Sequence, residues 1–109
     1  MAWLMRRGEV LASLEVANTV ASRLRGFGAQ QSRAGAMLIM PAHLPHSIGS
    51  KVDLDVAHLD SELCVIAMSR LKPARIGLWR PSARAIVEVE AGAFSRWTLC
   101  IGDQLEIKQ

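Results

Sequence analysis

The chain has 109 residues, of which 50% are hydrophobic and 21% charged, a composition that fits one globular domain and excludes a disordered chain. The net charge of +3 is too small to indicate nucleic-acid binding by itself. No stretch approaches the roughly 20 apolar residues of a membrane-spanning helix, and the N-terminus lacks a signal-peptide pattern. We therefore expect a cytoplasmic protein with a single domain over residues 1–109.

The N-terminal residues predict a β-hairpin followed by a short helix. Residues 3–5 are apolar, a turn with a glycine follows, and residues 10–16 alternate between two faces, as strands do. Asn18 or Thr19 can then cap a helix of about two turns, because its side-chain oxygen can accept a free N–H of the first turn. Gly26 can adopt the left-handed conformation that ends such a helix.

Three strands are predicted in the middle of the chain. Residues 35–41 form an apolar run that stops at a proline, and its length favours a buried strand over a helix. Residues 52–59 alternate, residues 63–68 form another apolar run, and Asp60 begins the turn between them. We expect the last two strands to form a hairpin.

The last third of the chain predicts a loop, a strand, a second short helix and a final strand. Residues 72–82 contain prolines and a glycine, which favours a loop. Residues 84–90 alternate between two faces. Phe94 and Trp97 have the spacing of one helix face, and residues 104–108 predict the closing strand.

Together these patterns predict an α+β domain with six to seven short strands and two short helices. Strands and helices do not alternate regularly along the chain, so a doubly wound parallel sheet is not expected. We expect a mostly antiparallel arrangement, either a β sandwich or a partly open barrel.

Residues 70–84 form a basic segment with five Lys or Arg side chains, no acid and one tryptophan, Trp79. Such a composition can contact phosphates and stack on bases. No signature of an RNA-binding fold accompanies the segment. We therefore favour a solvated loop whose tryptophan folds back onto the core, and nucleic acid is not the expected partner.

The two cysteines, Cys64 and Cys100, have neither the spacing of a metal-binding motif nor that of a redox motif. Both follow apolar residues in the sequence. We expect both to be small, buried hydrophobic residues. No metal or cofactor is predicted.

The stretch HSIGSKVDLDVAHLD contains the most suggestive polar residues. Asp53 and Asp55 point to one side of a strand, roughly 7 Å apart, and His58 points to the other side. A carboxylate pair can serve acid–base catalysis or share a metal, and Glu88 and Glu90 on a later strand are the obvious further ligands. The simpler interpretation, which we favour, is a solvated polar face of a strand.

The order and spacing of EVANT, RLRGFG, GAMLIMP, HSIG, LDVAHLD, AIVEVEAGAF and LCIGDQLEI resemble domain-of-unknown-function family number 192, from about Leu14 to Ile107. The resemblance implies a strand-rich α+β domain without an established activity. The HSIG form is similar to that of short actinobacterial members of the family. The resemblance to those members implies a protein without a signal peptide, whose gene lies near genes for tight-adherence pilus assembly.

The resemblance also indicates which of the polar residues match the family pattern. Asp53 and His58 stand where family members usually have proline and phenylalanine, so half of the polar set is not a family feature. Asp55 and Glu88 match the family pattern and are the better candidates for a shared role. The other matching positions are Gly26, residues 35–41, His46, Gly49, Leu54, Asp60, Arg84, Gly92, Gly102 and Asp103.

We expect a small non-catalytic binding or accessory module with a ligand site near His46, Asp55, Arg84 and Glu88. Its target would be a small polar ligand such as a sugar, or a partner protein of pilus assembly. The alternative is a carboxylate-dependent hydrolase that uses Asp55 or Glu88 with His46, which requires these side chains to converge in one pocket. A structural role is also open for Asp55, because its carboxylate could accept backbone N–H groups from the HSIGS loop.

Overall fold

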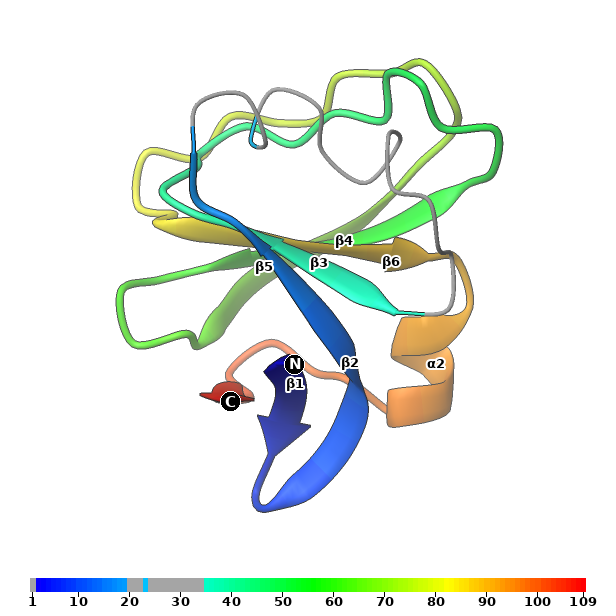
Figure 1. Ribbon diagram of the computed structural model, residues 1–109. Coiled ribbons are helices and arrows are strands. Elements are labelled where there is room, and N and C mark those ends of the chain that lie inside the picture. Colours follow the sequence, from blue (N-terminus) through cyan, green and yellow to red (C-terminus); the bar gives the residue numbers. More distant parts are fainter. Residues whose placement is uncertain (1, 20–22, 24–34) are drawn as a thin grey trace.

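The computed structural model describes residues 2–19, 23 and 35–109 (Figure 1). These residues form a seven-stranded sheet and one short helix. In chain order the elements are β1 (Ala2–Arg6), β2 (Glu9–Ala17), β3 (Ala36–Ile39), β4 (Leu54–Leu59), β5 (Val65–Leu71), β6 (Ala85–Glu90), α2 (Ala93–Trp97) and β7 (Glu106–Lys108).

The strands lie side by side in the order β5-β4-β6-β3-β2-β1-β7. Among these described strands, every neighbouring pair is antiparallel except β2 and β3, which run parallel. Parallel neighbours of this kind are joined by a longer connection than a hairpin turn. The mostly antiparallel, strand-rich arrangement is confirmed, and the parallel pair is the part that the sequence pattern did not predict.

The predicted strands are all present, with shifts of a few residues at their ends. The helix predicted around Phe94 is also present, as α2. Of the helix predicted from Asn18 or Thr19 to Gly26, the structure describes only Asn18, Thr19 and Arg23, and the remaining residues lie outside the described part. Two helices are therefore not confirmed.

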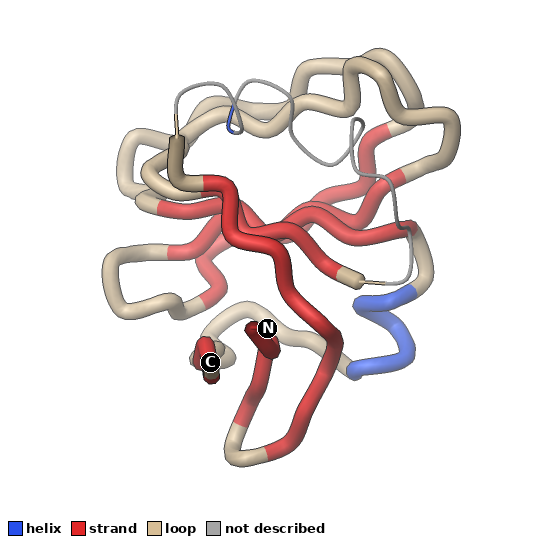
Figure 2. Tube along the Cα trace, viewed as in Figure 1, coloured by secondary structure: helices blue, strands red, loops and turns tan. Residues whose placement is uncertain are grey.

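The two outer strands of the sheet meet at one end. Gly102 donates its N–H to the Val65 carbonyl and the Val65 N–H reaches the Asp103 carbonyl, both at 2.8 Å. These hydrogen bonds join the segment before β7 to the first residue of β5. The sheet therefore curls, and the tube view shows the N- and C-terminal strands beside each other below the central strands (Figure 2).

The central strands are buried on both faces. All six residues of β4 are buried. Alternate side chains of this strand therefore point into two different cores, and neither face of the strand is exposed to solvent. Antiparallel partners share a face. Ala57 and its partner Val87 belong to the first core, whereas Val56 and its partner Glu88 lie on the opposite face, with the second core. The buried residues of the second core are Ala17, Met37, Ile39, Leu54, Val56, Leu71 and Ile86.

Two loops pair with each other over the second core. Residues 43–48 and 74–80, which we call the loop ribbon, run antiparallel, with a bridge between His46 and Ile76. Backbone hydrogen bonds of 2.8 and 2.9 Å lie on either side of that bridge. The two segments run side by side across the top of the molecule, in teal-green and yellow-green (Figure 1).

Ser47 anchors the loop ribbon. Its side chain is fully buried, and its hydroxyl donates to the Lys72 carbonyl at 2.5 Å and accepts the Arg75 N–H at 2.9 Å. The loop that the prolines and glycine predict is therefore held by specific hydrogen bonds. Trp79 does not fold back onto the core, because 64% of it is exposed, so that expectation is wrong.

The expectation of two buried cysteines is also wrong. Cys100 is exposed in the turn before β7, and Cys64 is half-buried just before β5. Both are free thiols. Consecutive side chains of a strand point to opposite sides. An apolar residue next to a cysteine can therefore be buried while the cysteine itself is exposed.

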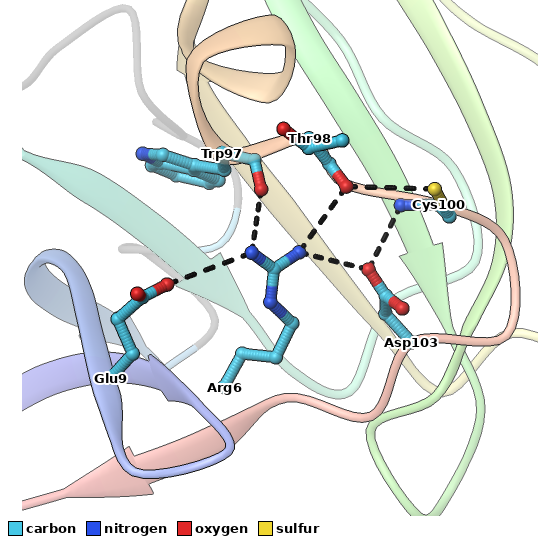
Figure 3. A network of polar contacts seen from close by, with 6 residues as sticks. All are labelled: Arg6, Glu9, Trp97, Thr98, Cys100 and Asp103. Carbon is cyan, nitrogen blue, oxygen red and sulfur yellow. Dashed lines mark hydrogen bonds and ion pairs between the residues drawn. The ribbon is translucent and has the colours of Figure 1, made fainter.

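A polar network joins β1 to the turn that follows α2 (Figure 3). The Arg6 guanidinium donates to the Trp97 carbonyl at 2.6 Å and to the Asp103 carboxylate at 3.0 Å. The same carboxylate accepts the Cys100 N–H at 2.9 Å. This hydrogen bond, helped by the Arg6 guanidinium, holds the pKa of Asp103 below its ordinary value.

Candidate functional site

Asp55 lies in the middle of the fold and binds backbone. It is only 5% exposed, so the solvated polar face expected for this residue is wrong. Its Oδ2 accepts the N–H groups of Gly92 at 2.9 Å and Phe94 at 3.1 Å, and its Oδ1 accepts Arg70 Nε at 3.2 Å. The carboxylate therefore caps the start of α2, since the first N–H groups of a helix have no partner within it.

Asp55 thus has the structural role that the sequence left open, but with a different partner from the one expected. The expected partner was the HSIGS loop, and the N–H groups that Asp55 accepts lie in the turn into α2 instead. Gly92 adopts a positive φ of 105° there, a conformation that glycine tolerates without strain. Three donors already bind the carboxylate oxygens of Asp55, so little of their hydrogen-bonding capacity is left for a ligand.

Asp55 and Glu88 lie on opposite faces of the sheet. Asp55 pairs with Val89, and Glu88 pairs with Val56, the next residue along β4. Because consecutive residues of a strand point to opposite faces, one pocket does not receive both carboxylates. The hydrolase that combines them is therefore not supported. Glu88 is fully buried on the face that carries the second core.

The other two predicted site residues lie in separate cavities. Arg84 lines a cavity of about 470 Å³ near Asp60, and its guanidinium donates to the carbonyls of Pro81 and Ala83. His46 lines a different cavity, and its Nδ1 accepts the N–H of Ile48 at 3.2 Å. The structure does not bring the four predicted residues together.

The cavity at His46 is the best candidate for a ligand site. It has a volume of about 460 Å³ and lies between the end of β3 and the loop ribbon. We call it the histidine cavity. Its lining residues are Arg23, Ile39, Ala42, His43, Leu44, His46 and Trp79.

The described lining of the histidine cavity is basic and partly apolar. It contains one guanidinium, two imidazoles and an indole, and the lining residues that the structure describes include no carboxylate. The Nδ1 atom of His43 is buried and has no hydrogen-bond partner among residues 2–19, 23 and 35–109. A buried polar atom of this kind calls for a partner, which a bound ligand or water can supply.

Neither His43 nor Arg23 is among the site residues that the sequence predicts. The only available signal for His43 was its three-residue spacing from His46, in a segment between two prolines. Arg23 reaches the cavity from a part of the chain that is distant in sequence, so no local pattern could identify it. No group of three or more His, Cys, Asp or Glu suited to a metal ion occurs in the described part of the chain.

His58 connects the sheet to the loop ribbon. It is 1% exposed, and its Nε2 lies 2.9 Å from the Leu78 carbonyl. A carbonyl can only accept, so Nε2 carries the proton and Nδ1 is the unprotonated nitrogen of the neutral ring. Burial lowers the pKa of His58, the Leu78 carbonyl opposes this effect, and the positive charge of Arg80 adds to it.

We expect acid to weaken the fold through His58. The unfolded chain takes up the proton near pH 6.5, whereas the folded imidazole resists it, so stability is present above that pH and is lost as pH falls through the lowered folded value. Arg80 faces the imidazole, and Glu88 shares its face of the sheet from the neighbouring strand. Urea unfolding between neutral and mildly acidic pH measures the loss.

The variant His58→Gln is the control for this pH effect. Its amide N–H can still donate to the Leu78 carbonyl but does not titrate. Its unfolding midpoint should depend less on pH than that of the unmodified protein. An equal acid sensitivity of the His58→Gln variant and the unmodified protein would contradict the assignment.

Comparison with known proteins supports a single fold family over nearly the whole chain. A family model described as "Uncharacterized ACR" matches residues 2–107. Two solved structures share the fold. A protein of unknown function from Novosphingobium aromaticivorans has 16% identity and a TM-score of 0.76, with 96% of this chain and 82% of that chain covered. A candidate transcription regulator from Sinorhizobium meliloti has 19% identity and a TM-score of 0.78, with coverages of 96% and 90%.

No curated protein matches the chain. Among the described residues, no helix is long and apolar enough to cross a membrane.

Proposed function

The chain belongs to the DUF192 family, whose activity is uncharacterized, and on that premise we propose that it is a small non-catalytic module that binds an anionic polar ligand in the histidine cavity. The cavity has the volume of a small-molecule site, which typically spans about 300–1,000 Å³. Its mixture of apolar walls and a few polar groups is also typical of such sites.

The charge of the lining supports an anionic ligand. Arg23 lines the cavity, and an arginine guanidinium can bind a carboxylate or phosphate through two parallel hydrogen bonds. His43 and His46 supply further ring nitrogens on the same cavity wall. The single observation that carries the proposal is the buried His43 Nδ1, which has no partner among the described residues and lies in a residue that lines the same cavity as Arg23.

Trp79 supports a ligand that also has a flat or weakly polar surface. Its indole lines the cavity and is 64% exposed, so it can pack against a ring without disturbing the core. A sugar that carries a carboxylate or phosphate combines both features. This extends the polar small ligand expected from the sequence by adding a negative charge to it.

The absence of a catalytic role is supported by the use of the carboxylates. Asp55 accepts three hydrogen bonds from the fold itself, and Glu88 lies on the other face of the sheet. The alternative target, a partner protein of pilus assembly, rests on the family resemblance.

Titration with glucuronate, a sugar carboxylate, tests the proposal. Heteronuclear NMR should show shifts at the histidine cavity, and glucuronate should bind about tenfold or more tightly than neutral glucose, because charge-assisted hydrogen bonds are the stronger ones. Arg23→Ala and His43→Ala should each weaken binding by roughly tenfold. Arg84→Ala, which removes the same type of side chain from the other cavity, is the matched control. Shifts that map to the Arg84 cavity, or equal binding of glucose and glucuronate, would overturn the proposal.

A further inference from the structure

The loop ribbon presents most of the exposed large hydrophobic side chains. Five of the nine such residues in the described part of the chain belong to it. They are Leu44 (45% exposed), Ile48 (55%), Ile76 (64%), Leu78 (65%) and Trp79 (64%). Side chains of this size are usually buried, and a gathered set marks an interaction surface.

The pairing of the ribbon explains why the exposed side chains of Leu44, Ile76 and Leu78 share one face. The bridge between His46 and Ile76 places both side chains on one face, and the same register sets Leu44 opposite Leu78. Pro45 lies on the opposite, buried face. The two segments therefore form an amphipathic ribbon, apolar on the face that lies away from the sheet.

Gly77 allows the ribbon to pack closely. A Cβ atom at this position would lie 2.7 Å from the Pro45 ring and 3.3 Å from Leu71. The inner face of the ribbon is thus tightly packed at Gly77.

The charge around the apolar face has one sign. No Asp or Glu occurs between Glu15 and Asp53 or between Glu62 and Glu88, and the loop ribbon belongs entirely to these two stretches. The exposed cations around it are Lys51, Lys72, Arg75 and Arg80. The two stretches that contain the ribbon therefore combine exposed apolar side chains with positive charge alone.

We propose that the loop ribbon docks the protein on an anionic lipid surface. The aliphatic tips and Trp79 would enter the headgroup region, where tryptophan is favoured, and the Lys and Arg side chains would contact anionic headgroups. The docking surface shares Leu44 and Trp79 with the lining of the histidine cavity, but it requires no ligand there. It describes reversible attachment by a surface, not insertion of a spanning helix.

A lipid surface fits these observations better than nucleic acid or a protein. Bases are bound by stacking on aromatic rings, whereas four of the five exposed apolar residues are aliphatic. A protein interface uses about one hydrogen bond per 100–200 Å², but the ribbon's backbone groups around the bridge already bond to each other. A lipid surface requires only apolar area and positive charge.

Vesicle co-sedimentation tests the proposal on the full chain. Binding should occur to mixed phosphatidylcholine and phosphatidylglycerol vesicles, weaken at high salt, and be absent for phosphatidylcholine alone. Arg75→Gln should lower the partition coefficient roughly fivefold, and Leu78→Ser roughly tenfold. Ile101→Ser is the matched control, because Ile101 is equally exposed (64%) but lies in the turn before β7, away from the ribbon.

Several results would overturn the docking surface. These are no binding to anionic vesicles, equal binding to neutral vesicles, or equal loss in the Ile101→Ser and Leu78→Ser variants. Binding to an oligonucleotide without vesicle binding would assign the surface to nucleic acid. A dimer seen by sedimentation and lost in Leu78→Ser would assign it to a second copy of the chain. His43→Ala should leave vesicle binding unchanged, so failure of the cavity proposal remains distinguishable.

Discussion

Replacing Asp55 with alanine should lower the free energy of unfolding by about 4 kcal/mol, because the substitution leaves two backbone N–H groups without an acceptor in a buried region, at about 1–3 kcal/mol each. The two groups belong to Gly92 and Phe94 at the start of α2. A loss of this size is a large fraction of the roughly 5–15 kcal/mol that stabilises a domain. Urea unfolding followed by circular dichroism measures it.

Two further variants separate the parts of the Asp55 interaction. Asp55→Asn keeps an oxygen that can accept an N–H and should cost less than the alanine variant. Arg70→Ala should cost under about 1 kcal/mol, because the Arg70 side chain is 57% exposed and exposed ion pairs contribute little. If Asp55→Ala instead keeps the full stability and loses binding of glucuronate, Asp55 is a ligand residue and the capping role is wrong.

Replacing Arg6 with alanine should cost about 2–3 kcal/mol, because hydrogen bonds that involve a charged group contribute about 1.5–3 kcal/mol. The guanidinium is mostly buried, with 14% of the side chain exposed, and it links β1 to the Trp97 carbonyl and to the carboxylate of Asp103 (Figure 3). Its loss frees the turn that leads from α2 to β7. Thermal and urea unfolding of the variant measure the effect.

Glu9→Ala is the matched control for the Arg6 network. Glu9 also contacts Arg6, but at 3.7 Å and with 70% of its side chain exposed, so its removal should change stability little. The network also predicts acid sensitivity. The pKa of Asp103 is held low in the fold, so its contribution is present above the ordinary value near 3.8 and is lost as pH falls through the lower folded value. A similar loss for Glu9→Ala and Arg6→Ala would contradict this assignment.

The sequence predicts only part of the interaction that Asp55 makes. A matched carboxylate in a strand suggested that it accepts backbone N–H groups, and it does. The donors lie 37 and 39 residues away in sequence, in the turn into α2. The HSIGS loop is closer to Asp55 in sequence, but the folded chain brings the later turn to its carboxylate.

The separation of Asp55 from Glu88 depends on strand register. Alternation within each strand correctly predicts which residues of that strand share a face. It contains no information on how β4 and β6 are aligned, and a shift of one residue exchanges the faces. The observed alignment sets Val56 opposite Glu88 and therefore divides the two carboxylates between the two cores.

The amino-acid sequence by itself determined the strands, their turns and the family, because alternation, turn residues and motif order are local properties of the chain. The hairpin turn at Asp60 is one such case, since the Asp60 carboxylate accepts the N–H groups of Glu62 and Cys64 next to it. The tertiary structure alone decided the parallel pairing of β2 with β3, the histidine cavity and the outward face of the loop ribbon. Each of these depends on which distant segments lie together and in which register, and the free energy that selects them comes from burying surfaces that are far apart along the chain.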